Sequence, residues 1–225
     1  SNELKDWISG INIPKNVNIK FAGSDEEREE SAKFLGNAMI GALFLMFIIL
    51  LTQFNSFYQA TITLSTVILS TIGALTGLMI VGQYFSVIMT GLGIVSLAGI
   101  IVNNSIVLID TYNRLKDQHE DPIETILHSA VQRFRPIVLT TATTMIALVP
   151  VALQITIGWF DRSIEFGGLM AAWWVPFSTA VIWGLGFSSV LTLFLVPSLL
   201  AIPIYLNKSK YKLVRLFRTK TQPAE

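Results

Sequence analysis

An adjacent pair of amide side chains, Asn103 and Asn104, interrupts an apolar and small-residue stretch that runs from Gly91 to Tyr112. Amides that are held away from water need hydrogen-bond partners, so groups on other segments must supply them. Asn103 and Asp110 are seven residues apart, a spacing that places both on one face of a helix. Side chains of these types could form a hydrated polar path for a proton or an ion.

A second polar set follows further along the chain. Thr140 and Thr144 share a helix face, Thr141 lies beside them, and Arg133 and Arg135 precede the set. Buried hydroxyls and amides most often serve as interhelical hydrogen bonds that contribute about 1 kcal/mol or less each. The residues leave both interpretations open, structural hydrogen bonding and a proton path. A proton-driven device needs an ionisable group at membrane depth, and the apolar runs of this chain contain none.

The composition places these polar residues in a membrane protein. Hydrophobic residues make up 52% of the 225 positions and charged residues 14%, a balance that a water-soluble domain would have difficulty hiding from solvent. Charges avoid the apolar runs and gather near the chain ends and in the links between runs. The chain has no cysteine, which excludes disulfides and thiolate metal ligands.

Five apolar runs reach, or nearly reach, the roughly 20 residues that a membrane-spanning helix needs. They predict an all-α polytopic membrane protein with a transmembrane domain over 34–206. The spans are expected at about 34–51, 58–81, 85–109, 136–158 and 175–205. Trp173, Trp174 and Pro176 predict an entry to the last span at the membrane interface.

Basic residues predict the orientation of the spans. Arg114, Lys116, Arg133 and Arg135 lie in the link between the third and fourth spans, and a basic tail occupies 207–225. Lys and Arg concentrate in cytoplasmic loops, so this link and the tail are predicted to be cytoplasmic. An odd number of spans then places the N-terminus on the outer side.

The N-terminal residues 1–33 predict a short α+β segment outside the membrane. Apolar and polar residues alternate over 17–21, as in a strand with one buried face, and 24–27 form a capping box that starts a helix running into the first span. We interpret the segment as the end of a larger periplasmic domain. A solvated acidic leader is the alternative.

The cytoplasmic link predicts a helix of its own. Asp121, Pro122 and Glu124 supply an N-cap, a first-turn proline and a capping-box glutamate. Apolar residues then recur at helical spacing, which predicts an amphipathic helix over 122–134 on the membrane surface.

Catalytic and cofactor motifs are absent from the sequence. Its glycine pairs lack a phosphate-binding context, and it contains no nucleophile elbow or metal-ligand cluster. The sequence therefore disfavours an enzyme and predicts no cofactor, no metal site and no nucleic-acid partner. Gly73 and Gly77 belong to a stripe of small residues that allows close helix packing, and Gly99 leaves room for a neighbour beside Asn103.

Three stretches carry a more specific pattern: GIIVNNSIVLIDTYNRL at 99–115, DPIETILHSAVQRFRPIVLTTATTMIALVPVAL at 121–153, and WWVPFSTAVIWGLGFSSVLTLFLVPSLL at 173–200. They resemble the C-terminal transmembrane half of a resistance-nodulation-division efflux permease of the multidrug and hydrophobe exporter branch. The resemblance implies a drug:proton antiporter of the bacterial inner membrane, driven by the proton motive force and exporting amphiphilic compounds. Its N-terminus would be periplasmic and its C-terminus cytoplasmic.

The resemblance also implies partners and site residues. This chain would pair in the bilayer with the N-terminal half of the same permease, in a homotrimer that joins a periplasmic adaptor and an outer-membrane channel in a Gram-negative cell. By position, Thr140 and Arg133 match a threonine and an arginine of the family's proton relay, and Asn103 occupies the position of its lysine. We expect Asn103 and Asn104 to hydrogen-bond to an aspartate pair of the other half.

Two other functions remain open. A protein-export accessory of the same superfamily would differ in the span count and insertion size of the whole gene. The other is a non-transporting remnant or membrane scaffold, which would lack adjacent aspartates in a span upstream of this chain. A heavy-metal exporter is disfavoured because the methionines and carboxylates in the spans do not suggest a metal relay.

Overall fold

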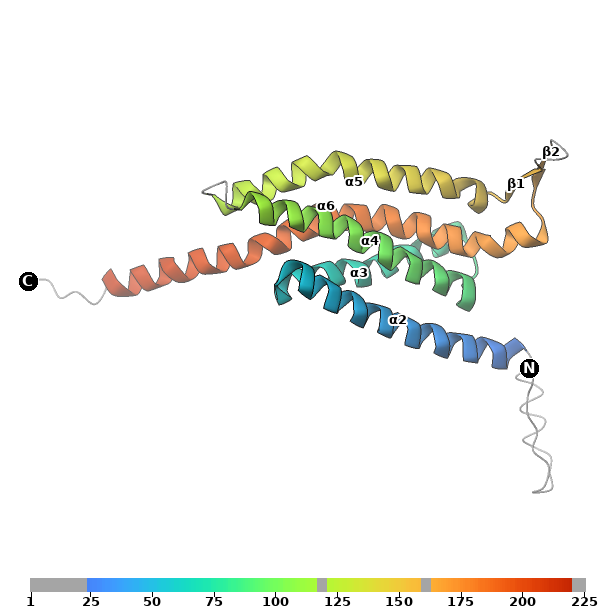
Figure 1. Ribbon diagram of the computed structural model, residues 1–225, viewed down its shortest axis with the longest axis horizontal. Coiled ribbons are helices and arrows are strands. Elements are labelled where there is room, and N and C mark those ends of the chain that lie inside the picture. Colours follow the sequence, from blue (N-terminus) through green and yellow to red (C-terminus); the bar gives the residue numbers. More distant parts are fainter. Residues whose placement is uncertain (1–23, 117–120, 159–162, 220–225) are drawn as a thin grey trace, which may run out of the picture.

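The computed structural model describes residues 24–116, 121–158 and 163–219. Five long helices dominate it (Figure 1): α2 (Ser24–Phe54), α3 (Phe57–Val81), α4 (Val87–Leu115), α5 (Pro122–Ala152) and α6 (Leu169–Thr219). Each contains a segment long and apolar enough to cross a membrane. The prediction of an all-α chain with five long apolar helices is therefore confirmed. The strand predicted over 17–21 lies outside the described residues.

Side-chain caps set where the helices begin. Ser56 and Ser86 accept hydrogen bonds from backbone N–H groups at the first turns of α3 and α4, at 3.4 Å and 3.3 Å. Asp121 Oδ1 accepts one from the Ile123 N–H at 3.0 Å and starts α5, as the sequence predicted. Gly82 ends α3 at φ 70°, a left-handed conformation that glycine adopts without a steric penalty.

The structure does not show a separate helix over 122–134. These residues form the first turns of α5, which continues through Pro136. A proline inside a helix usually kinks or breaks it because it removes a backbone hydrogen bond. Here Ile126 and Ile137 are both buried, 6% and 2% exposed, so packing fixes α5 on both sides of the proline. Likewise, α6 begins before Trp173 and runs without a break to Thr219.

A hairpin that the sequence did not predict joins α5 to α6. Strands β1 (Ile155–Gly158) and β2 (Ser163–Phe166) pair in antiparallel register, with Ile155 opposite Phe166. Helix α5 consequently ends at Ala152, short of the predicted span end at 158. Two β-branched isoleucines and a threonine in β1 favour the strand locally.

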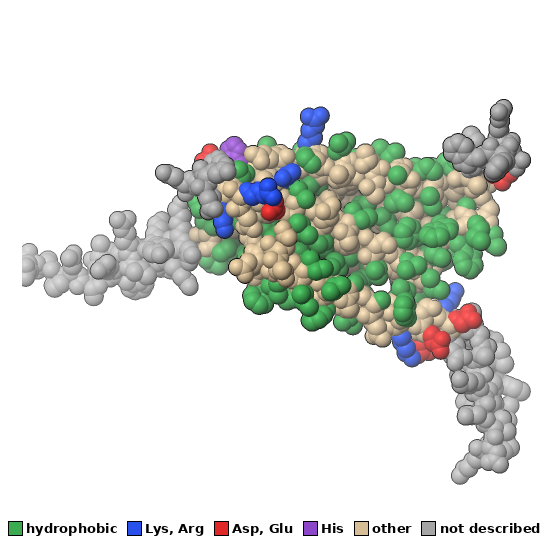
Figure 2. All heavy atoms as spheres, viewed as in Figure 1, with side chains coloured by type: hydrophobic (Ala, Val, Ile, Leu, Met, Phe, Trp, Pro, Cys, Tyr) green, Lys and Arg blue, Asp and Glu red, His purple; other side chains and the backbone are tan. Residues whose placement is uncertain are grey.

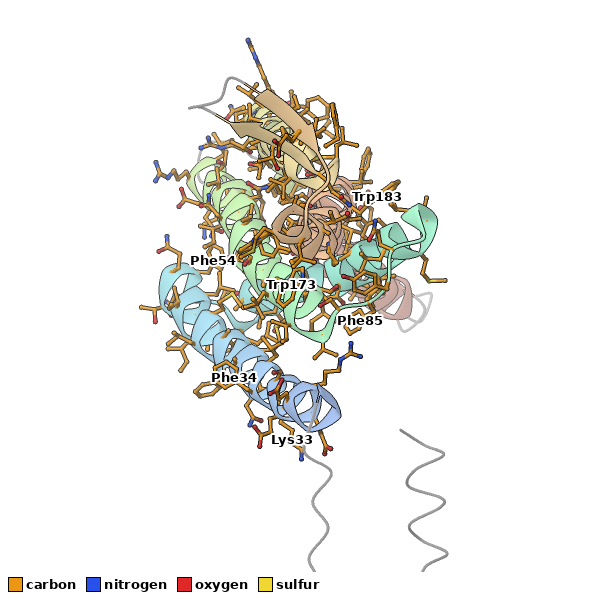
Figure 3. The ribbon with its side chains drawn as sticks, turned by 90° about the vertical axis from the view of Figure 1, so that its right-hand side faces the viewer. Lys33, Phe34, Phe54, Phe85, Trp173 and Trp183 are labelled. Carbon is orange, nitrogen blue, oxygen red and sulfur yellow. The ribbon has the colours of Figure 1, made fainter. Side chains whose placement is uncertain are left out.

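Helix α6 lies at the centre of the bundle and packs against α3, α4 and α5, whereas α2 lies at one edge (Figure 3). The beginning of α2 and the end of α6 lie at opposite ends of the bundle (Figure 1). In the space-filling view, most charged side chains lie toward the two ends of the described bundle, a basic side chain projects from the upper edge between them, and the rest of the surface is apolar or uncharged (Figure 2). The largest fully buried apolar side chains come from α2, α4 and α6: Leu50, Leu97, Ile101, Leu108, Ile109, Leu185 and Val196.

Glycines on α3 allow the close approach of α6. A Cβ atom added at Gly73 would overlap the Phe187 side chain, and one added at Gly77 would overlap Trp183. Both clashes involve the Cβ and Cγ atoms of the aromatic residue, which cannot move without the α6 backbone. The small residues on α3 therefore set the distance between the two helices.

Candidate polar site on α4

The structure separates the two adjacent amides. Asn103 is exposed, whereas Asn104 is 8% exposed and belongs to the buried face of α4. Successive residues of an α-helix point about 100° apart, so packing buries one amide and leaves its neighbour at the surface. Of the pair, Asn103 is the amide that another protein segment could reach.

Asn103 lies on a face of α4 that carries small and polar residues, interrupted by the half-buried Val107 between Asn103 and Asp110; we call these small and polar residues the α4 polar stripe. Its members recur at spacings of three, four and seven, so they share one side of the helix. All are exposed except Asp110, which is half-buried. The stripe comprises Ser96, Gly99, Asn103, Asp110 and Arg114. Among the described residues, nothing lies within 4 Å of a Cβ atom added at Gly99.

Helices α2 and α5 lie on two sides of α4 (Figure 1). On one side, Gly91 is about 120° around the helix from Asn103 and meets Leu35 of α2. On the other side, Thr111 is about 80° from Asn103 and contacts Arg133 of α5. The stripe therefore occupies the uncovered sector of α4 between these two neighbours.

Arg133 is connected to α4 by a short hydrogen bond. Its Nε–H donates to Thr111 Oγ1 at 2.6 Å, and the Thr111 hydroxyl donates to the Val107 carbonyl at 2.8 Å. Thr111 is 4% exposed and Arg133 is half-buried. The bond fixes α5 against the end of α4 and places a cation at the edge of the stripe. No sequence pattern predicted this pairing, since Thr111 is an ordinary helix residue there.

Thr140 lies at about the depth of Asn103. Helices α4 and α5 run in opposite directions (Figure 1). Thr111 and Arg133 mark one level at which the two helices touch. Asn103 is eight residues before Thr111 and Thr140 is seven residues after Arg133, so at 1.5 Å per residue they lie about 12 Å and about 10 Å from that level, in the same direction. Thr140 is exposed, and its hydroxyl donates to the Ile137 carbonyl at 3.0 Å. The arrangement brings an amide, a hydroxyl and a cation to neighbouring parts of two helices.

Charge pairing at this end involves helix neighbours. Asp110 Oδ2 and Arg114 Nε are 2.9 Å apart in an i,i+4 pair, with the Arg114 side chain largely exposed. Such pairs contribute only a few tenths of a kcal/mol when exposed. Among the described residues, no group of three or more His, Cys, Asp or Glu side chains could hold a metal ion.

Other polar groups in the bundle act as contacts between helices. Thr66 and Ser105 lie 3.3 Å apart between α3 and α4, and Thr141 and Ser189 lie 2.8 Å apart between α5 and α6. These hydroxyls are buried and satisfy each other, as expected for groups away from water. Interhelical hydrogen bonding therefore accounts for these polar residues.

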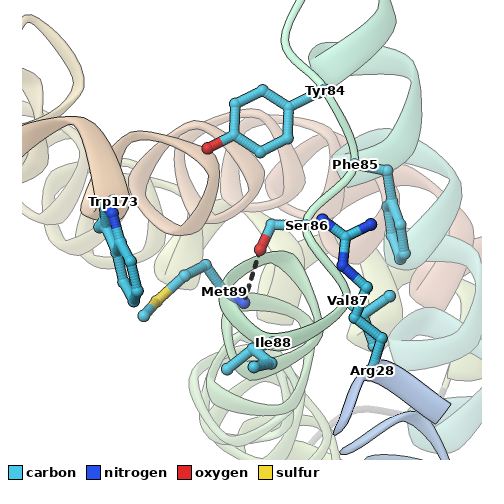
Figure 4. A pocket seen from close by; sticks show the side chains of 8 residues that line it. All are labelled: Arg28, Tyr84, Phe85, Ser86, Val87, Ile88, Met89 and Trp173. Carbon is cyan, nitrogen blue, oxygen red and sulfur yellow. Dashed lines mark hydrogen bonds between the residues drawn. The ribbon is translucent and has the colours of Figure 1, made fainter. Parts of the chain in front are cut away.

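A pocket at the opposite end was not foreseen from the sequence (Figure 4). It has a volume of about 320 Å³ and lies between the first turns of α2, the turn from α3 to α4, and the beginning of α6. Arg28, Tyr84, Phe85 and Trp173 contribute a guanidinium and three aromatic rings. Tyr84 and Trp173 are residue types typical of a membrane interface, the role that the sequence predicted for Trp173.

Comparison with known proteins identifies the family. The model of the AcrB/AcrD/AcrF family matches residues 1–203. This chain belongs to that family. It therefore forms part of the membrane domain of a resistance-nodulation-division transporter, a class of transporters rather than enzymes.

Individual relatives agree on the family and differ in their described roles. The swarming motility protein SwrC of Bacillus subtilis (strain 168) is 30% identical over 207 residues, which are 92% of this chain and 18% of SwrC. Two crystal forms of a heavy metal efflux pump are 27% identical, with TM-scores of 0.70 and 0.68. They cover 92% and 88% of this chain, which spans 19% and 18% of the pump. The likeness does not single out the multidrug branch.

Proposed function

We propose that this chain is the C-terminal membrane portion of an efflux transporter that is driven by the proton motive force and exports amphiphilic or hydrophobic compounds. The observation that carries the proposal is the α4 polar stripe, an uncovered polar face on a helix long and apolar enough to span a membrane. A polar face of this kind is unfavourable against lipid and favourable against a polar partner. The N-terminal half of the permease is the partner we propose.

The α4 polar stripe and the adjacent residues of α5 together supply the neutral and cationic groups of a proton site. The Asn103 amide can donate to a carboxylate and can also accept from a protonated acid, so it can serve both states of an acid on the other half. Thr140 and Arg133 contribute a hydroxyl and a positive charge. We assign Asn103 to the contact with the other half, whereas Asn104 is buried and supports the packing of α4.

The remaining features of the proposal concern the whole protein. It is a multi-pass protein of the bacterial inner membrane with its N-terminus in the periplasm and its C-terminus in the cytoplasm. It works as a homotrimer and, in a Gram-negative cell, with a periplasmic adaptor and an outer-membrane channel. Arg114 and Lys116 lie at the end of α4, and Arg133 and Arg135 lie in the first half of the antiparallel α5, so these basic residues share one half of the bundle, which supports this orientation.

Metal ions are the second candidate substrate, because two similar structures are of a heavy metal efflux pump. We favour amphiphilic compounds because a metal path through this half would need a series of soft or anionic ligands. The described carboxylates and histidines do not gather into such a group. Comparing export of an amphiphilic dye with export of Cu⁺ and Zn²⁺ by the full-length protein separates the two candidates.

The test of the α4 polar stripe is Asn103→Leu in the full-length permease. Loss of a hydrogen bond to a charged group is expected to slow pH-dependent dye efflux from energised vesicles by about tenfold, whereas Asn103→Gln retains most of the rate. The matched control is Asn37→Leu, the same change at an exposed amide on α2, which should leave the rate unchanged. Normal, pH-dependent efflux by Asn103→Leu would rule out a role for this amide.

A further inference from the structure

The contact between Thr111 and Arg133 has a defined direction. Arg133 Nε–H is the donor at 2.6 Å, because an arginine has no acceptor. The Thr111 hydroxyl hydrogen is directed to the Val107 carbonyl, 2.8 Å away on its own helix. The Thr111 Oγ1 atom can therefore accept the Arg133 Nε–H of α5 with a lone pair. Thr111 is 4% exposed, so water has little access to replace either bond.

This contact uses one of the five guanidinium hydrogens and leaves the four on the Nη atoms. Fixing Nε sets the plane of the rigid, planar guanidinium, and the Nη donors move with it. Bidentate recognition of a carboxylate depends on that orientation. Thr111 therefore determines how Arg133 presents its charge beside the α4 polar stripe.

Other charged groups near this end are already paired or lie on the outer surface. Asp110 pairs with Arg114 at 2.9 Å, and Glu124 lies 3.8 Å from His128. Residues 57–81 of α3 and 169–206 of α6 contain no Asp, Glu, Lys, Arg or His. Within the described part of the chain, Arg133 forms no ion pair. Besides Arg133, the charged and titratable groups on the two helices that meet here, with the C-cap of α4, are Asp110, Tyr112, Arg114, Lys116, Glu124, His128 and Arg135.

We propose that Thr111 is a positioning residue for proton coupling, which holds the Arg133 guanidinium in the orientation that an acid of the other half requires. The inference rests on the proposed function, because it assumes that Arg133 faces such an acid. Thr111 touches neither proton nor substrate in this role. It acts through Arg133.

The first test is Thr111→Val in the full-length permease, a change that preserves shape and removes the acceptor. An arginine that is no longer held stabilises the ionised acid less, so the apparent pKa of transport should rise. We expect dye efflux in energised vesicles to fall about fivefold at unchanged KM, with its pH profile displaced upward by about half a unit. Thr111→Ser restores the acceptor and should restore both the rate and the profile.

Thr141→Val is the matched control. Thr141 is 6% exposed and forms an interhelical bond to Ser189 at 2.8 Å, so the change deletes a comparable buried hydroxyl on α5. It should lower thermal stability about as much as Thr111→Val does and leave the pH profile in place. If the pH profile of dye efflux moved equally in Thr111→Val and Thr141→Val, Thr111 would have only a packing role, and the inference would be overturned.

A double-mutant cycle separates this inference from the proposed function. If Thr111 acts through Arg133, Thr111→Val should add no further loss in an Arg133→Lys background. Impaired efflux by Arg133→Lys together with a normal pH profile for Thr111→Val would overturn the positioning role and leave the proposed function intact. Normal efflux by both Arg133→Lys and Arg133→Leu would overturn the role of Arg133 itself.

Discussion

Replacing Gly77 by leucine is expected to lower the free energy of unfolding of the helical bundle by about 3 kcal/mol. Gly77 is buried, and a Cβ atom there would overlap the Cβ and Cγ atoms of Trp183 on α6. Rotation of the indole ring cannot relieve a clash at the base of its side chain, so α3 and α6 must separate. Gly73 meets Phe187 one turn away, and that contact would be strained as well.

The measurement is the thermal midpoint at which the full-length permease in detergent loses its monodisperse peak. Gly36→Leu is the control, because no described atom lies within 4 Å of a Cβ atom added at Gly36. This control should keep the wild-type midpoint. Combining Gly77→Leu with Trp183→Gly should recover part of the loss, because glycine at 183 removes the overlapping Cβ and Cγ atoms. An unchanged midpoint for Gly77→Leu would contradict the close contact between α3 and α6.

The sequence was sufficient to predict the helices because their signal is local. Apolar length defines the five membrane-crossing segments, and Asp121 with Pro122 marks the beginning of α5. The predicted end of the fourth span at 158 was wrong, because α5 ends at Ala152. Residues 155–157 are as apolar as a span, and hydropathy does not distinguish a strand from a helix there. The hairpin is therefore identified by the pairing of β1 with β2 in the structure and not by the sequence.

The polar site was only partly predictable. Periodicity shows which residues share a helix face and not which neighbour that face meets. Asn103 and Asn104 are chemically identical, so the sequence could not indicate which of them is buried. The bond from Arg133 to Thr111 joins residues 22 positions apart on two helices, and neither residue type requires the other. Family resemblance singled out Arg133, and the packing of α4 on α5 identified its contact.

A second large effect is expected from Gln59→Leu. Gln59 Nε2 donates to Asn113 Oδ1 at 2.8 Å, and Asn113 Nδ2 donates back to Gln59 Oε1 at 2.9 Å, so α3 and α4 are joined by a reciprocal pair of half-buried amides.

Removing Gln59 leaves the half-buried Asn113 amide without either partner, which should lower the free energy of unfolding by about 1 kcal/mol. The double variant Gln59→Leu/Asn113→Leu replaces both amides by apolar groups and should be more stable than Gln59→Leu. This order follows because an unpaired buried amide is less favourable than the loss of the hydrogen bonds themselves. The thermal midpoints of the full-length permease variants, measured by the same assay, give this order of stability. If the double variant were less stable than either single variant, the two amides would be making separate contacts rather than satisfying each other.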